Sequence, residues 1–182
     1  MKVLLTGGNG FIGSHILDVF RAEGHDLRLL LRESSDTRFI EGHLPEIEVH
    51  YGSLLDPASL ARAAEGMGCI VHCAGKTKAL DTGDYYRVNR DGTAHMVEAA
   101  NHHGDVVQQF IHISSRAVNG PGTAEDPVRE EDEPAPISHY GRSKMEAERE
   151  VTGGCEVPWT VLRPSGVYGP RDADFLGAFR GV

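Results

Sequence analysis

A tyrosine and a lysine four residues apart carry the strongest chemical signal in this sequence. Tyr140 and Lys144 frame the segment Tyr-Gly-Arg-Ser-Lys, and side chains at that spacing on a helix lie on one face, one turn apart. A nearby ammonium favours the phenolate, so we expect the pKa of Tyr140 to fall from about 10 toward working pH. Such a phenol can exchange a proton with a substrate hydroxyl or carbonyl. The same spacing also arises by chance as a surface pair, so its surroundings decide the interpretation.

A glycine-rich turn near the start of the chain supplies the context. Residues 6–13 read Thr-Gly-Gly-Asn-Gly-Phe-Ile-Gly directly after the apolar run 3–5. A backbone without side chains at Gly7, Gly10 and Gly13 lets a pyrophosphate approach, and a following helix offers free N–H donors and a partial positive charge. Phe11 and Ile12 lie inside this turn. A plain glycine turn between packed elements is the alternative, and the strand before it and the helix after it favour the dinucleotide-binding interpretation.

Strand and helix patterns alternate along the whole chain. The expected strands cover residues 2–6, 27–31, 47–51, 69–73, 110–114 and 159–162, and the expected helices cover 12–23, 57–65, 84–103 and 138–151. Repeated strand-then-helix units predict an α/β fold with a Rossmann-type, doubly wound parallel sheet of at least six strands and helices on both faces. All 182 residues are then one dinucleotide-binding domain.

Composition excludes several classes of protein. The net charge of −9 and the pI near 5.5 argue against nucleic-acid and anionic-membrane partners. No run approaches the roughly 18 apolar residues of a membrane span, and no signal peptide is visible, so we expect a cytoplasmic protein. The cysteines Cys69, Cys73 and Cys155 are odd in number, and we expect Cys69 and Cys73 to be buried side chains on one strand face rather than a disulfide or metal site.

Taken together and in their order along the chain, these motifs resemble those of the extended short-chain dehydrogenase/reductases. This family comprises NAD(P)-dependent epimerases, dehydratases and reductases of sugar nucleotides, flavonoids and sterols. The resemblance covers essentially the whole chain. Besides the glycine turn and the Tyr140–Lys144 pair, the segments that carry it are His-Cys-Ala-Gly at 72–75, Asn-Arg-Asp-Gly-Thr at 89–93, Ile-Ser-Ser-Arg-Ala-Val-Asn-Gly at 113–120 and Leu-Arg-Pro-Ser-Gly-Val-Tyr-Gly-Pro-Arg at 162–171.

The resemblance implies a role for each matching residue. Tyr140 is then the general acid/base, Lys144 holds the nicotinamide ribose and tunes Tyr140, and Ser115 hydrogen-bonds the reacting oxygen, with Ser114 as the alternative serine. Asn89 supports a water and backbone relay or, equally, is a hydrogen-bonded helix residue. The remaining cofactor-binding positions that the resemblance implies are Ser53, Leu54, Ala74, Gly75, Pro164 and Val167.

Three positions bear on the cofactor and the substrate. Arg32 ends the second strand, where an NAD-binding turn usually has an acid on the ribose hydroxyl, and an arginine there can pair with a 2′-phosphate. We therefore expect NADP, with NAD as the alternative. The placement of an arginine at this position resembles the dihydroflavonol-reductase-like branch of the family. Ser53-Leu54 lacks the carboxylate that the family often places after the third strand. Asn119 stands where a tyrosine is common, which makes a sugar-nucleotide substrate less secure.

The expected activity is hydride transfer at a carbonyl or alcohol carbon of a small molecule: a sugar nucleotide, or a flavonoid-like or sterol-like compound. A non-catalytic dinucleotide-binding sensor is the alternative. The family usually carries a substrate-binding lobe after the segment that matches residues 164–174, and the sequence ends at Val182, so we expect that lobe to be absent or truncated after about residue 170. The apolar surface that this would leave around Phe175, Leu176 and Phe179 favours association into homo-oligomers.

Overall fold

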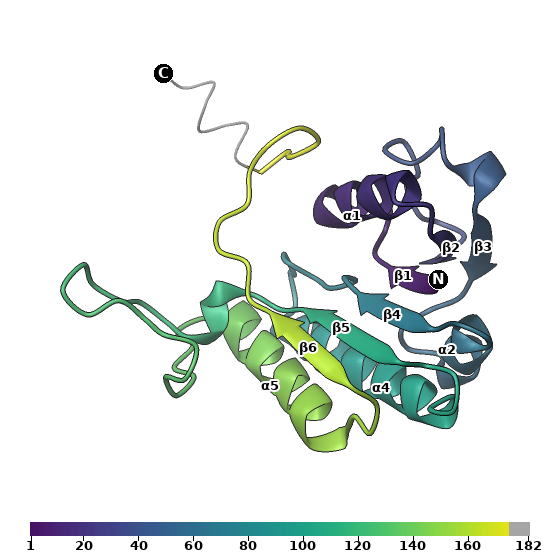
Figure 1. The fold of residues 1–182 in the computed structure, drawn as a ribbon. Helices are drawn as coiled ribbons and strands as arrows, with labels where there is room; N and C mark the ends of the chain where they lie inside the picture. Colours follow the sequence, from purple (N-terminus) through teal and green to yellow (C-terminus); the bar gives the residue numbers. More distant parts are fainter. Residues whose placement is uncertain (175–182) are drawn as a thin grey trace.

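The computed structural model describes residues 1–174 and shows one six-stranded, fully parallel sheet (Figure 1). The strands are β1 (Lys2–Thr6), β2 (Asp26–Leu31), β3 (Glu48–Tyr51), β4 (Cys69–His72), β5 (Gln109–Ile113) and β6 (Trp159–Leu162). Their order across the sheet is β3-β2-β1-β4-β5-β6, with every neighbouring pair parallel. This is the doubly wound order of dinucleotide-binding folds. The fold class predicted from the sequence is confirmed, and each strand boundary lies within one residue of its prediction.

The helices follow their predicted positions, with one difference. They are α1 (Phe11–Ala22), α2 (Pro57–Ala64), α3 (Thr82–Tyr85), α4 (Gly92–His102) and α5 (His139–Gly154), with short 3₁₀ turns η1 (Leu44–Glu46) and η3 (Arg116–Val118). The long helix expected over 84–103 is interrupted by a π-helical turn, η2 (Tyr86–Asp91). The prediction of one uniform helix was therefore wrong. A π turn widens the helix by one residue per turn and commonly marks a functional segment.

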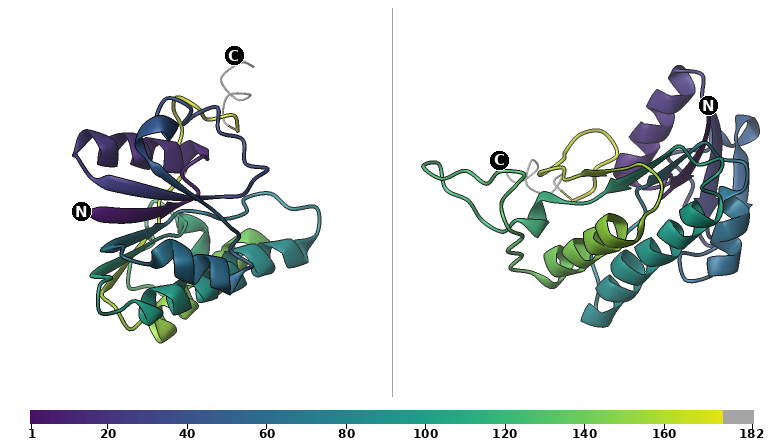
Figure 2. Two further views of the ribbon diagram at one scale, coloured as in Figure 1. Left: turned by 90° about the vertical axis from the view of Figure 1, so that its right-hand side faces the viewer. Right: turned by 60° about the horizontal axis from the view of Figure 1, so that its bottom comes forward.

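Helices cover the two faces of the sheet unequally. In Figures 1 and 2, α1 lies on one face, whereas α2, α4 and α5 lie together on the other. Two apolar cores result: one beneath α2, α4 and α5, which includes Phe110 and Met96, and one beneath α1, which includes Leu17 and Leu29. Cys69 is buried and Cys73 is half-buried in contact with the α1 core, and both are free thiols.

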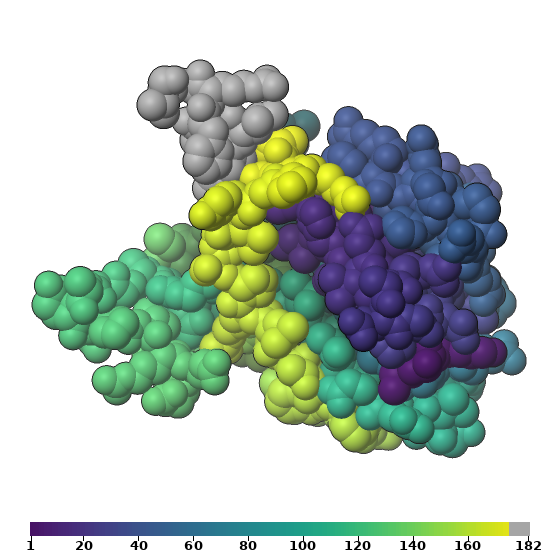
Figure 3. Space-filling view, turned by 45° about the horizontal axis from the view of Figure 1, so that its top comes forward, coloured from purple at the N-terminus to yellow at the C-terminus, as the bar shows by residue number. Residues whose placement is uncertain are grey.

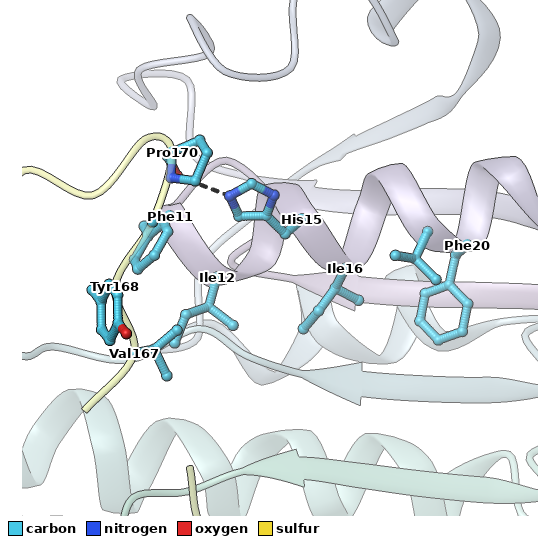
Figure 4. A pocket seen from close by; sticks show the side chains of 10 residues that line it. Phe11, Ile12, His15, Ile16, Phe20, Val167, Tyr168 and Pro170 are labelled. Carbon is cyan, nitrogen blue, oxygen red and sulfur yellow. Dashed lines mark hydrogen bonds between the residues drawn. The ribbon is translucent and has the colours of Figure 1, made fainter. Parts of the chain in front are cut away.

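Only part of the apolar surface of α1 faces the sheet, where Ile16 and Phe20 pack against the core beside the buried Leu17. Ser14 and Leu17 are the fully buried side chains of this helix, whereas Val19 is 61% exposed. The chain after β6 instead lies across the helix (Figure 3), where His15 Nε2 hydrogen-bonds the Pro170 carbonyl at 2.9 Å. Helix and returning chain enclose an apolar groove of about 450 Å³ (Figure 4). Its lining residues are Phe11, Ile12, His15, Ile16, Val19, Phe20, Val167, Tyr168, Gly169 and Pro170.

Polar side chains begin the two helices that follow loops at the carboxyl edge of the sheet. Asp56 caps α2 by accepting from Ser59 N at 3.2 Å, and Ser138 caps α5 by accepting from Gly141 N at 3.0 Å. Each cap satisfies a backbone donor that the first turn leaves without a helical partner. The cap at Ser138 fixes the point at which α5 begins and therefore places Tyr140 in its first turn. Within residues 1–174, no helix has the length and apolar character to span a membrane.

Candidate active and cofactor site

The glycine turn and the segment after β4 meet at the centre of the sheet's carboxyl edge. β1 and β4 are neighbours, with Thr6 opposite His72 in the register, and the chain leaves them toward opposite faces. This is the topological switch point at which open α/β sheets form a crevice. An ideal Cβ at Gly7, whose φ is +71°, would lie 2.7 Å from the backbone of Ala74, so the two loops are in direct contact there.

The glycines of the turn differ in how much space surrounds them. A Cβ at Gly13 would lie 2.0 Å from the Gly7 carbonyl oxygen, so the fold itself requires a glycine at 13. A Cβ at Gly10 would meet only that same oxygen, at 3.4 Å, and Gly10 has ordinary extended angles of φ −82° and ψ 178°. Gly10 also begins α1 without any side-chain cap. The N-terminus of α1 therefore keeps free N–H donors behind an open space at Gly10, the arrangement that accommodates a pyrophosphate.

Ser115 and Tyr140 are brought together by a close approach of α5 to η3. A Cβ at Gly141 would lie 2.4 Å from the Ala117 carbonyl oxygen, so only a glycine allows this contact beside Tyr140. The Ser115 hydroxyl accepts from Ala117 N at 3.2 Å and lies beside the Tyr140 phenol, near enough to influence the pKa of that phenol. The serine and the phenol thus share one point at the carboxyl edge of the sheet.

The expected lowering of the tyrosine pKa is not what the structure shows. Burial raises the pKa of Tyr140 above its usual value, the hydrogen bond from Ser115 opposes that rise, and the charges of Cys73 and Tyr85 add to it. Lys144 does not contribute to the shift. The physical reason is that burial disfavours the phenolate more than the surrounding groups favour it, so the phenol is protonated at neutral pH.

The Lys144 ammonium is buried and turned toward β5. Its side chain is 4% exposed, and Nζ donates to the Ile113 carbonyl at 2.8 Å and to His112 Nε2 at 3.3 Å. Burial lowers the pKa of Lys144 to about 8, against the attraction of Cys73 and Glu148. Gly75 lies on its other side, since a Cβ there would be 4.0 Å from Nζ.

The two consecutive serines after β5 point to different partners. Ser114 donates to the buried carboxylate of Glu148, which Arg163 also holds through Nε at 2.9 Å and Nη2 at 2.6 Å. Arg163 Nη1 also reaches the buried Asn119 Oδ1 at 3.4 Å. Ser114 is therefore part of an ion-pair cluster that joins β5, β6 and α5, and only Ser115 lies beside Tyr140. Asn119 is enclosed in the same cluster.

Asn89, in the π turn, is fully engaged with neighbouring groups. Its Oδ1 accepts from Lys76 N at 2.7 Å, and its Nδ2 donates to Lys76 O at 3.1 Å and to Ser143 Oγ at 2.9 Å. Ser143 in turn donates to the Tyr140 carbonyl at 2.7 Å. Of the two interpretations open from the sequence, this geometry favours a hydrogen-bonded residue that ties the loop after β4 to α5.

The other predicted cofactor residues lie in four separate places. Arg32 is exposed at the end of β2, and within residues 1–174 no carboxylate lies at ion-pair distance from it. The Ser53 hydroxyl closes a local turn by accepting from Leu55 N at 3.2 Å, and Leu54 packs against the core and Gly92. The groove on α1 includes Phe11, Ile12 and Val167, and Pro164 is held by its carbonyl to Arg116 N at 2.9 Å.

Two buried histidines and the Glu148–Arg163 pair were missed from the sequence. His72 accepts at Nδ1 from Thr6 Oγ1 at 2.8 Å and donates at Nε2 to Thr93 Oγ1 at 3.1 Å; the assignment follows because Thr93 gives its own hydrogen to Asn89 O. Burial lowers the pKa of His72 to about 3, so this ring is neutral. The available signal was a histidine within each of two otherwise apolar central strands. No group of His, Cys, Asp and Glu in the described chain could hold a metal ion.

The fold and this site define a Rossmann-type domain with a serine, a tyrosine and a lysine at the carboxyl edge of its sheet. The chain belongs to the NAD dependent epimerase/dehydratase family, whose model matches residues 3–180. The family suggested by the motifs is thereby confirmed.

Similar proteins have varied activities. A ceramide reductase of Caulobacter vibrioides is 32% identical over 98% of this chain and 50% of its own length, and a UDP-glucose 4-epimerase of Vibrio cholerae is 30% identical over 98% and 56%. The Bordetella bronchiseptica enzyme WbmG, solved with NAD and UDP, has a TM-score of 0.83 at 27% identity and covers 94% of this chain and 55% of its own. The chain thus spans about half the length of these relatives.

Proposed function

We propose that this chain is the cofactor-binding and catalytic part of an NAD(P)-dependent oxidoreductase, epimerase or dehydratase. The reaction is hydride transfer at a carbonyl or alcohol carbon of a small molecule. The observation that carries the proposal is the placement of Ser115 beside Tyr140, at the sheet edge where the glycine turn also lies, by the close approach of α5 to η3. A nucleotide sensor needs the turn but has no use for a serine and phenol held together beside a buried lysine.

The residues of the site fit a nicotinamide dinucleotide. The uncapped α1 N-terminus and the space at Gly10 suit a pyrophosphate, and Lys144 is the buried cation for the ribose hydroxyls. The dinucleotide, when bound, supplies the hydride acceptor or donor. Tyr140 gives a proton to a carbonyl oxygen during reduction and takes one from a hydroxyl during oxidation, and Ser115 holds that oxygen. The raised pKa of Tyr140 keeps the phenol protonated at neutral pH, which a proton donor to a carbonyl oxygen requires.

Gly10→Val is expected to abolish NADPH binding while leaving the fold intact. The backbone angles at Gly10 suit any L-residue, and the new Cβ meets only one protein atom within 4 Å. The branched side chain instead fills the space that the pyrophosphate must enter. Isothermal titration calorimetry with NADPH tests binding, and circular dichroism tests the fold.

Gly42→Val is the matched control, because a Cβ at Gly42 has no atom within 4 Å and its φ lies outside the glycine-favouring region. That variant should bind NADPH as the parent does. Equal affinity of the parent and Gly10→Val would exclude the turn as the pyrophosphate site.

We further propose a preference for NADP over NAD, based on Arg32. Loss of a hydrogen-bonded charge pair with the 2′-phosphate costs about 1.5–3 kcal/mol. Arg32→Ala should therefore weaken NADPH about 10- to 150-fold and change NADH little. Competitive titration of both dinucleotides measures the two affinities.

Arg38→Ala is the control for this prediction, because Arg38 lies on the same loop but pairs with Asp36 at 3.1 Å. It should lower NADPH affinity much less than Arg32→Ala. WbmG was solved with NAD, and a parent chain that binds NADH as tightly as NADPH would contradict our proposal.

A further inference from the structure

The ring of His112 lies fully buried between the lysine of the site and a second histidine. Its Nε2 is 3.3 Å from Lys144 Nζ, and its ring stacks on that of His72, with centroids 5.4 Å apart and planes at 27°. Its Nδ1 is buried and has no hydrogen-bond partner among the described residues. A buried polar atom without a hydrogen-bond partner destabilises the folded state. Packing alone therefore does not explain why a histidine occupies this position.

The hydrogen bonds of Lys144 assign a tautomer to His112. A protonated Lys144 has three N–H donors and no acceptor, so the Nε2 atom facing it must accept. The single ring hydrogen then lies on Nδ1, the atom without a partner. Burial and the Lys144 charge hold the pKa of His112 well below its usual value, so the ring is a neutral acceptor.

Two of the three ammonium hydrogens are accounted for by β5. One goes to the Ile113 carbonyl and one to His112 Nε2, which are adjacent residues of the same strand. The third hydrogen has no partner within residues 1–174. Because two bonds from one strand fix the rotation of the ammonium about its Cε–Nζ bond, the third donor has one direction.

We propose that His112 is a positioning residue that orients the Lys144 ammonium, so that its one remaining N–H serves the cofactor ribose. The inference rests on the proposed function only where it names the cofactor ribose as the partner of the third N–H. The hydrogen bond between His112 and Lys144, called the His112–Lys144 link below, can be tested without a cofactor. The ring has no direct contact with substrate in this role and acts through Lys144 alone.

The surroundings of Lys144 define what a titration should show. Cys73 and Glu148 stabilise its charged form, His72 faces His112 as a neutral ring, and Tyr140 lies one turn away on α5. The charge of Lys144 is present below about pH 8 and is lost as the pH rises through that value. Removing a neutral acceptor disfavours the ammonium, so the midpoint should move to lower pH.

Two variants of His112 separate orientation from packing. His112→Phe keeps a ring against His72 and removes the acceptor, whereas His112→Gln keeps an acceptor and removes the ring. The Lys144 midpoint is expected to fall by about one unit in the Phe variant and to stay near the parent value in the Gln variant. His112→Met replaces His112→Phe if that protein does not fold.

The measurement is NMR titration of ¹³C-labelled lysine side chains. The sequence contains four lysines, Lys2, Lys76, Lys78 and Lys144, and the spectrum of Lys144→Met assigns the signal of the fourth. A Phe variant that titrates as the parent does, or a Gln variant that shifts as far as the Phe variant, would overturn the role of His112.

NADPH affinity, measured from pH 6 to 9 on the same proteins, completes the test. It is expected to fall about tenfold at neutral pH in the Phe variant and to match the parent in the Gln variant. If the Lys144 midpoint shifts as expected but no variant changes NADPH affinity, the His112–Lys144 link stands and the ribose contact of the proposed function is wrong.

Discussion

Tyr140→Phe is expected to lower turnover by about 10²–10⁴-fold in a protein that carries this chain together with a substrate-binding lobe. The change removes one oxygen, which lies beside Ser115 and is the proton donor that we propose for the reacting oxygen. The phenyl ring keeps its place opposite Tyr85, whose ring centroid is 6.2 Å away. Cofactor affinity should therefore remain near the parent value. Nicotinamide absorbance in a screen of carbonyl and alcohol substrates provides the rate.

Lys144→Ala serves as the contrasting variant for this prediction. Because we propose that Lys144 holds the cofactor ribose, its loss should raise the cofactor dissociation constant and, through the misplaced cofactor, lower turnover as well. If Tyr140→Phe and Lys144→Ala showed the same kinetic defect, the separate roles proposed for the two residues would be wrong. A Tyr140→Phe protein with parental turnover would exclude Tyr140 as the acid/base.

The sequence was sufficient for the sheet and for the face that carries the site. Glycines at 7, 10 and 13, the alternation of strands and helices, and the four-residue spacing of Tyr140 and Lys144 are local signals. Right-handed crossovers then leave few arrangements for parallel strands. The strand order places the ends of β1, β4 and β5 side by side at one edge, where the glycine turn, Gly75 and Ser115 follow these strands.

The electrostatics of the site could not be predicted in the same way. The pKa of Tyr140 depends on burial and on groups 55 to 67 residues away, Tyr85 and Cys73, which only the folded chain brings near. The spacing of Tyr140 and Lys144 correctly gave their helix, but Lys144 turns its ammonium to β5 rather than to the phenol. The periodicity of α1 likewise gave the helix, but not that a returning chain segment lies against part of its apolar surface.

Glu148 and Arg163 illustrate the same limit for stability. Glu148 follows Lys144 by four residues on α5 and reads from the sequence as a surface charge, yet it is 5% exposed. Arg163 approaches it from the end of β6 and Ser114 from the end of β5. The cluster therefore fixes α5, which carries Tyr140 and Lys144, against the strand that leads to Ser115. Its loss should affect both folding stability and the geometry of the site.

Arg163→Met is expected to lower the free energy of unfolding by about 3 kcal/mol, because it leaves the Glu148 carboxylate buried with only Ser114 as a partner. The estimate lies at the lower end of the range for broken buried pairs, since the Arg163 side chain is 25% exposed. Urea unfolding followed by circular dichroism measures it. Replacement of both partners, Glu148→Met with Arg163→Met, removes the uncompensated charge and should recover most of the loss. Equal destabilisation in the single and double variants would show that the pair acts through its packing and not through its charge.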